Sequence, residues 1–326
     1  MRRLARPAAL ATALALAPWA ACHAGTVRYC DGSAPMSAAQ QDRLFRFAAV
    51  IKRTLDDSGA SLALVARSGL DLSRFGVRYS HAGVSLKQGL DTAWSVRQLY
   101  YDCDESKPRL FDQGVAGFVL GLNDPAAGYV SVVTLPEPEA ATLQRAVLDK
   151  PHALQALGTR YSANAHAFSV MYQNCNQWVA EILAAAWGPP PDSGSPGTGD
   201  EARAQAQRWL AQQGYQPHVF EVGFRPLMWL GRLIPHLHDD DHPPADLAAA
   251  RYRVSMPASI DAFVQARVPG AQRLEFCQAG TRIVIRRGWT PIAEGCVATG
   301  QDTTITLERV CPQSLRVPGP VASSAP

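Results

Sequence analysis

The sequence predicts an α+β fold, in which antiparallel strands pack against helices. Two observations indicate this class. Residues 175–186 carry apolar side chains at helical spacing, whereas residues 77–86 alternate between two faces and precede a second extended run at 92–101. The chain has 326 residues, of which 47% are hydrophobic, so it is long and apolar enough to bury a full core.

The first 24 residues are expected to be a signal peptide. Three arginines open the chain, and a short apolar stretch follows at residues 10–17. Small residues before Gly25 are typical of a cleavage site. The apolar stretch is too short to span a membrane. We therefore expect the signal peptide to be cleaved and the mature protein to be periplasmic or secreted. The alternative is a lipoprotein anchored at Cys22.

Removal of this segment changes the charge of the protein. The whole chain has a formal net charge of +3, and the signal peptide contains three arginines and no acidic residue, so the mature protein is near neutral (3 − 3 = 0). No run rich in lysine or arginine follows. Nucleic acid is therefore not an expected partner, and neither is an anionic membrane surface.

The predicted elements of the main domain, residues 25–187, follow from periodicity. A helix begins at Ser37, and its apolar stripe runs as far as Leu55. The other expected elements are a buried strand at 62–66, the two extended runs at 77–86 and 92–101, a helix or apolar loop at 111–122, a strand at 129–135 and a helix at 137–148.

A linker is expected at residues 188–199, because GPPPDSGSPGTG is rich in proline, glycine and serine. The domain is expected to continue over residues 200–268. Residues 269–326 are predicted to be a small C-terminal extension that ends in a disordered tail from Pro318. Beyond the linker, the expected elements are helices at 201–213 and 259–268, and strands at 215–222, 274–278, 281–289 and 303–310.

The cysteines fit an oxidising compartment, because six of them remain after removal of the signal peptide. Cys277, Cys296 and Cys311 lie close together in the sequence, so we expect a local bridge among them. A bridge between Cys30 and Cys103 is a weaker expectation. If all six cysteines pair, none is left as a nucleophile.

Cys175 is the candidate nucleophile. Asn174 is a good N-cap, and Gln177 lies at the capping-box position, so Cys175 falls in the first turn of a helix. The positive end of the helix dipole favours a thiolate there and lowers the pKa of the thiol. The alternative is an inert buried cysteine.

His81 is the candidate base. It lies on the predicted strand 77–86, and small residues follow it on its face. A two-residue turn at Gly89-Leu90 would pair His81 with Gln98, which would orient the imidazole ring. Asp102 has the same parity and is the second choice for this third residue. A half-buried strand histidine without a catalytic role is the alternative.

Residues 236–242 contain several side chains that can bind metals. Their spacing matches neither H-E-x-x-H nor an EF-hand loop. We therefore expect a solvated polar loop here, and no metal or other cofactor.

Two motifs carry a resemblance to known proteins. Residues 79–84 (Y-S-H-A-G-V) resemble the H-x-G strand of circularly permuted NlpC-like papain-fold proteins, a group that includes lecithin:retinol acyltransferase relatives and bacterial YiiX-like proteins. Residues 174–179 (N-C-N-Q-W-V) are similar to the N-C-x-x-F-V nucleophile helix of that group. Together with residues 67–76, these motifs also resemble a bacterial exported family catalogued as domain of unknown function 2145.

The resemblance implies a papain-like domain, with an antiparallel sheet packed on the nucleophile helix. It implies that Cys175 is a nucleophile and His81 its base. The expected activity is a thiol hydrolase or acyltransferase that acts on an amide or ester, with a cell-envelope peptide or lipid as substrate. The Cys175 backbone N–H and the Gln173 side chain are the expected oxyanion donors. The alternative is a non-catalytic periplasmic binding or envelope-assembly protein.

Overall fold

The computed structural model describes residues 36–89, 92–189, 199–223, 228, 230, 231, 233, 234 and 236–307. All of them belong to one unit of the chain, Ala34–Pro326. The predicted signal peptide, Cys22, Gly25, Cys30, Cys311 and the tail from Pro318 lie outside the described residues, as do linker residues 190–198.

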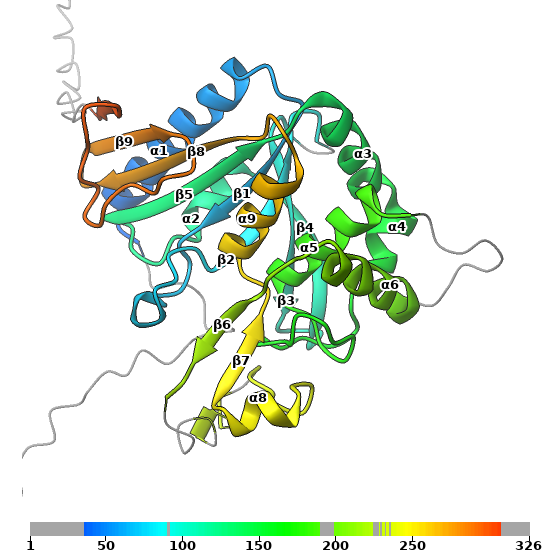
Figure 1. The fold of residues 1–326 in the computed structure, drawn as a ribbon. Helices are drawn as coiled ribbons and strands as arrows, with labels where there is room; N and C mark the ends of the chain where they lie inside the picture. The colour runs from blue at the N-terminus through cyan, green and yellow to red at the C-terminus, as the bar shows by residue number, and fades with distance from the viewer. Residues whose placement is uncertain are drawn as a thin grey trace, which may run out of the picture. The chain divides into compact units, whose positions relative to one another are not determined.

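An eight-stranded antiparallel sheet forms the centre of the described fold (Figure 1). Its strands lie in the order β10-β9-β8-β5-β1-β2-β3-β4. Their bounds are β1 Leu62–Arg67, β2 His81–Leu86, β3 Ser95–Asp102, β4 Lys107–Gly114, β5 Ala127–Thr134, β8 Gln272–Ala279, β9 Arg282–Arg287 and β10 Thr303–Thr306. A separate pair joins β6 (His218–Glu221) to β7 (Arg251–Val254). The α+β class with a large antiparallel sheet is therefore confirmed.

Helices lie on both faces of the sheet. The helices of the described residues are α1 Ala38–Asp57, α2 Val115–Leu120, α3 Glu137–Leu148, α4 Lys150–Gln155, α5 Cys175–Trp187, α6 Gly199–Gln212, α8 Pro244–Ala248 and α9 Pro257–Arg267, with a short 3₁₀ helix, η1, at Ser73–Phe75. Helix α1 begins where the sequence predicts it, because Ser37 and Gln40 form a complete capping box.

The two faces of the sheet have different neighbours (Figure 1). On one face, Val65 and Val96 belong to an apolar core shared with α1 and α2. On the other face, Arg97 donates to the carbonyl of Val147 in α3. Helix α5 packs against β2 and β3 and also contacts α3 and α9. Helix α5, which carries the candidate nucleophile, therefore lies on the face opposite α1 and α2.

The C-terminal strands do not form a separate extension, which corrects the prediction. Strand β8 pairs with β5 along its whole length, so β8, β9 and β10 continue the main sheet. One of the local bridges that the sequence allowed is present, because Cys277 is bonded to Cys296. Cys103 is also disulfide-bonded.

Several short elements are not in the sequence prediction. Strand β4 occupies the start of the segment predicted as a helix or apolar loop, and only α2 is helical there. Helices α4 and α8 and strand β7 are also unpredicted. No helix in the described part of the chain is long and apolar enough to cross a membrane.

Candidate active site

Cys175 is the first residue of α5, as the sequence predicts. The Asn174 side chain accepts a hydrogen bond from the Gln177 backbone N–H at 2.8 Å. Only this half of the capping box forms, because the Gln177 side chain donates to Ser169 and Glu181 instead. Among the described cysteines, Cys175 alone carries a free thiol, and 7% of the residue is exposed.

The thiol lies against the first residues of β2. Its sulfur is 3.9 Å from the Ser80 carbonyl oxygen, to which the Asn176 side chain also donates at 3.1 Å. The backbone N–H groups of Ala82, Asn176 and Cys175 itself are near enough to the sulfur to oppose the rise of the thiol pKa. The sulfur therefore sits among three donors, and two of them come from the unpaired first turn of the helix.

The β2–β3 register differs from the prediction by two residues. Val84 pairs with Arg97, whereas a Gly89-Leu90 turn would pair it with Ser95. The strands are joined by a longer loop, because β2 ends at Leu86 and β3 begins at Ser95. A shift of two residues preserves side-chain parity, so Gln98 still shares a face with His81.

His81 and Gln98 are brought together by this parity. His81 Nε2 and Gln98 Oε1 are 2.7 Å apart, and both side chains are buried. An amide oxygen only accepts, so Nε2 carries the proton and Nδ1 keeps its lone pair. The His81 ring stacks on Tyr100 at a centroid distance of 4.8 Å. Asp102, the second choice, instead accepts from the backbone N–H groups of Asp104 and Glu105, so it caps a turn.

The ring and the thiol lie on opposite faces of the sheet. His81 pairs with Arg67, and its ring lies 6.1 Å from the Phe118 ring of α2, whereas Cys175 comes from α5 on the other face. The β2–β3 ladder ends at the Val84–Arg97 pair, which leaves the Ala82 N–H for the sulfur. No hydrogen bond joins the ring to the sulfur among the described contacts.

Both groups are neutral in this arrangement. Burial raises the pKa of the Cys175 thiol to about 11, although the Arg67 charge and the three N–H groups oppose the rise. Burial and the nearby Arg67 charge lower the pKa of His81 to about 3. The expected lowering of the thiol pKa is therefore wrong for this state, because the loss of water outweighs the helix terminus.

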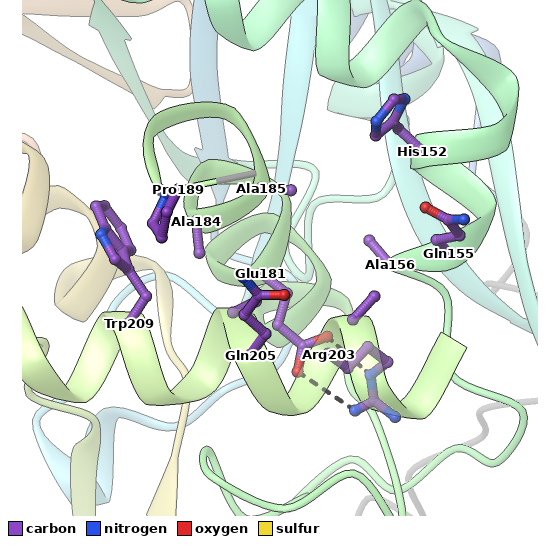
Figure 2. Close-up of a pocket in the computed structure, with 13 residues that line it drawn as sticks. His152, Gln155, Ala156, Glu181, Ala184, Ala185, Pro189, Arg203, Gln205 and Trp209 are labelled. Carbon is purple, nitrogen blue, oxygen red and sulfur yellow. Dashed lines mark hydrogen bonds and ion pairs between the residues drawn. The ribbon is translucent and has the colours of Figure 1, made fainter. Parts of the chain in front are cut away.

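Gln173 does not reach the thiol. Its side-chain N–H groups donate to the Ala156 carbonyl and to Glu181, at 2.7 and 2.5 Å, and its oxygen accepts from the Gly158 N–H. Arg203 of α6 closes this network through an ion pair with Glu181 at 2.9 Å (Figure 2). Gln173 therefore fixes the entry to α5, and its predicted role as an oxyanion donor has no geometric support.

Two cavities lie near α5. The smaller, of 220 Å³, is lined by Glu181, Ala184 and Trp209 among others, near the end of α5 away from Cys175 (Figure 2). The larger is an open cleft of 710 Å³, lined by Tyr79 and Met256 among others. Tyr79 precedes Ser80, and Met256 contacts the Asn176 side chain. Cys175 and His81 do not line the larger cleft, but it borders their neighbours, so it is the candidate substrate site.

The histidine-rich segment, residues 236–242, packs onto the loop that precedes α5. The His238 ring stacks on Tyr172, and His242 Nε2 lies 2.8 Å from the Asn164 carbonyl oxygen. Across the described residues, no three side chains of metal-binding type are arranged to hold an ion.

Two contributors to the site are not among the residues that the sequence predicts. One is the Ala82 backbone N–H, which is available only because β3 diverges from β2. The other is Arg67 at the end of β1, whose charge acts on both His81 and Cys175. An arginine at the end of an apolar strand was a signal for the second, but no sequence pattern reveals the first.

A family model described as an uncharacterized protein conserved in bacteria (DUF2145) matches residues 54–264. The matched region contains β1 to β7 and the candidate site. No curated protein and no solved structure gives a significant match to the chain.

Proposed function

The chain belongs to the DUF2145 family of uncharacterized bacterial proteins, and we propose that it is a cysteine hydrolase or acyltransferase with a permuted NlpC-like, papain-type site. The observation that carries the proposal is the free Cys175 thiol at the first turn of α5, which lies against the start of the strand that carries His81. The side-chain amide of Gln98, which binds the His81 ring, supports the same assignment. A nucleophile, a base and a residue that orients the base are the parts that such chemistry needs.

In this proposal, the Cys175 sulfur attacks the carbonyl carbon of an amide or ester while its proton passes to His81 Nδ1. A neutral imidazole with its lone pair on Nδ1 is competent for this step. The carbonyl oxygen becomes negative and accepts from the Cys175 and Ala82 N–H groups. His81 then protonates the departing amine or alcohol. Water or an acceptor nucleophile finally releases the acyl group from the sulfur.

The compartment and substrate class belong to the same proposal. Three disulfide-bonded cysteines, Cys103, Cys277 and Cys296, support an exported protein. An exported enzyme meets the molecules of the cell envelope, so the proposed substrate is a peptide or lipid of the envelope. The 710 Å³ cleft is large enough for a drug-sized part of such a molecule.

A non-catalytic binding protein is the second candidate. The observation that favours it is the burial of Cys175, which leaves 7% of the residue exposed and raises the thiol pKa to about 11. A protein that had lost the chemistry would keep the cleft and have no use for a reactive thiol.

Acylation by p-nitrophenyl acetate separates the two candidates. We expect one acetyl group on Cys175, located by peptide mass spectrometry, and none in Cys175→Ser. His81→Ala should slow acylation by about 10²–10⁴-fold, the usual contribution of a general base. The control is His152→Ala, because His152 is exposed and its ring pairs with Asp149. Absence of acetyl-Cys175 in the folded protein would reject the enzyme in favour of the binding protein.

A further inference from the structure

Arg67 is a buried cation that contacts no carboxylate of the described residues. Only 6% of it is exposed. Its guanidinium donates to the Gly121 carbonyl and, at 3.1 Å, to the Tyr100 hydroxyl, and both acceptors are neutral. Its Nε–H is buried and has no hydrogen-bond partner.

The other buried arginines are all paired. Arg97 contacts Asp112, Arg203 contacts Glu181 and Arg273 contacts Asp261, at 2.6, 2.9 and 3.3 Å. A buried charge without a partner is costly, so proteins supply a counter-charge or a ligand. Arg67 departs from this rule, and it does so beside the candidate active site.

The fold holds the guanidinium in place by close backbone approach. A Cβ added at Gly121 would lie 2.5 Å from Arg67 Cζ, and one added at Gly69 would lie 2.5 Å from Nη1. The Phe118 ring covers the group at 5.5 Å from its centroid. Two glycines and one aromatic ring therefore form a cradle that any larger residue at position 69 or 121 would obstruct.

A second unpartnered donor lies in the same cluster. Gln98 is fully buried, and its Nε2 has no partner, while its oxygen binds His81. Tyr100 stacks on His81 and accepts a hydrogen bond from Arg67. The side chains of Gln98 and Arg67 are therefore both linked to the His81 ring, the first directly and the second through Tyr100. Two donors and one positive charge match the two oxygens of a carboxylate.

The large cleft is lined by chain neighbours of this cluster, although Arg67, Gln98 and Tyr100 do not line it themselves. Ser68, Leu70 and Asn123 line the cleft. Gly69, whose missing Cβ makes room for the guanidinium, stands between the first two of these residues. A ligand that fills the cleft therefore contacts the chain on both sides of Gly69.

We infer that Arg67 and Gln98 bind a carboxylate of the substrate, so that the preferred substrate is an amide or ester that carries a free carboxylate close to its scissile carbonyl. This inference rests on the proposed function for its reaction and on the unpartnered donors for its ligand. The charge of Arg67 is neutralised when such a substrate enters.

Two alkylating reagents test the inference, because iodoacetate and iodoacetamide differ chiefly in a carboxylate. We expect the ratio of the two alkylation rates of Cys175, iodoacetate over iodoacetamide, to be about tenfold higher than the same ratio for glutathione. A tenfold change corresponds to about 1.4 kcal/mol. Arg67→Gln should reduce this preference to the glutathione value, whereas Arg67→Lys should retain part of it. An unchanged preference in Arg67→Gln would overturn the inference and leave the acylation result untouched.

Acetate binding gives a readout that does not need a reactive thiol. The ¹⁵N signals of the His81 ring should shift saturably when acetate is added to the wild-type protein, and they should not shift in Arg67→Gln. Gly121→Ala should act like Arg67→Gln, because the added methyl group displaces the guanidinium. The absence of a saturable shift in the wild-type protein would overturn the inference even if p-nitrophenyl acetate acylates Cys175.

Discussion

Replacement of Arg203 by methionine is expected to lower the free energy of unfolding by about 3–5 kcal/mol. The side chains of Arg203 and Glu181 are 0% and 1% exposed, so the substitution leaves the Glu181 carboxylate buried without its ion-pair partner. Burial already raises the pKa of Glu181, and Arg203 opposes that rise. Arg203 also donates to the carbonyls of Val170 and Tyr172, which belong to the loop before α5.

Urea unfolding measures this effect. The matched control is Lys52→Met, which breaks an ion pair to Asp56 whose two side chains are 44% and 42% exposed, and it should change stability by less than about 1 kcal/mol. A double variant, Arg203→Met with Glu181→Gln, should recover part of the loss because it removes the stranded charge. A loss below about 1 kcal/mol in Arg203→Met would show that the pair does not hold α5.

Acidification is expected to destabilise the protein through His81. The pKa of His81 is about 3 in the folded protein and about 6.5 in the unfolded chain, so the unfolded chain binds more protons between these values. Stability therefore rises with pH across this window and is lost as pH falls from about 6.5 towards 3. The full effect is up to about 4–5 kcal/mol, and about 3 kcal/mol of it should be lost by pH 4.

The contribution of His81 is isolated by comparison with His81→Gln, which cannot titrate. The free energy of unfolding should fall more steeply with acid in the wild-type protein than in this variant. Other buried histidines, such as His166 and His242, are present in both proteins and cancel in the difference. Parallel pH profiles for the two proteins would show that His81 is not held neutral by burial.

The sequence predicts helix α5 well because the signals for this helix are local. The Asn174 cap and the apolar stripe both lie within the helix they define, and α5 begins where they place it. The shared face of His81 and Gln98 also follows from the sequence, since parity survives an error of two residues in the register. The register itself does not follow, because the joining loop is longer than the predicted turn.

Features that depend on distant segments are not predictable in the same way. The pairing of β8 with β5 joins residues more than a hundred positions apart, so the C-terminal strands look separate in the sequence. Strand β4 lacks regular alternation, and its sequence K-P-R-L-F-D-Q-G gives no strand signal. The raised thiol pKa depends on burial by α5 and β2 together, which no helix-terminus argument includes.

The tautomer of His81 is the most direct test of the proposed site, and ¹⁵N NMR of the imidazole ring measures it. We expect the His81 ring to be neutral at all pH values from about 5 to 8. Its Nε2 should carry the proton, which it donates to Gln98, and its Nδ1 should be unprotonated. Gln98→Leu should mix the two tautomers and leave the ring neutral. A proton on Nδ1 in the wild-type protein, or titration of His81 near pH 6.5, would contradict the proposal that this nitrogen receives the proton of Cys175.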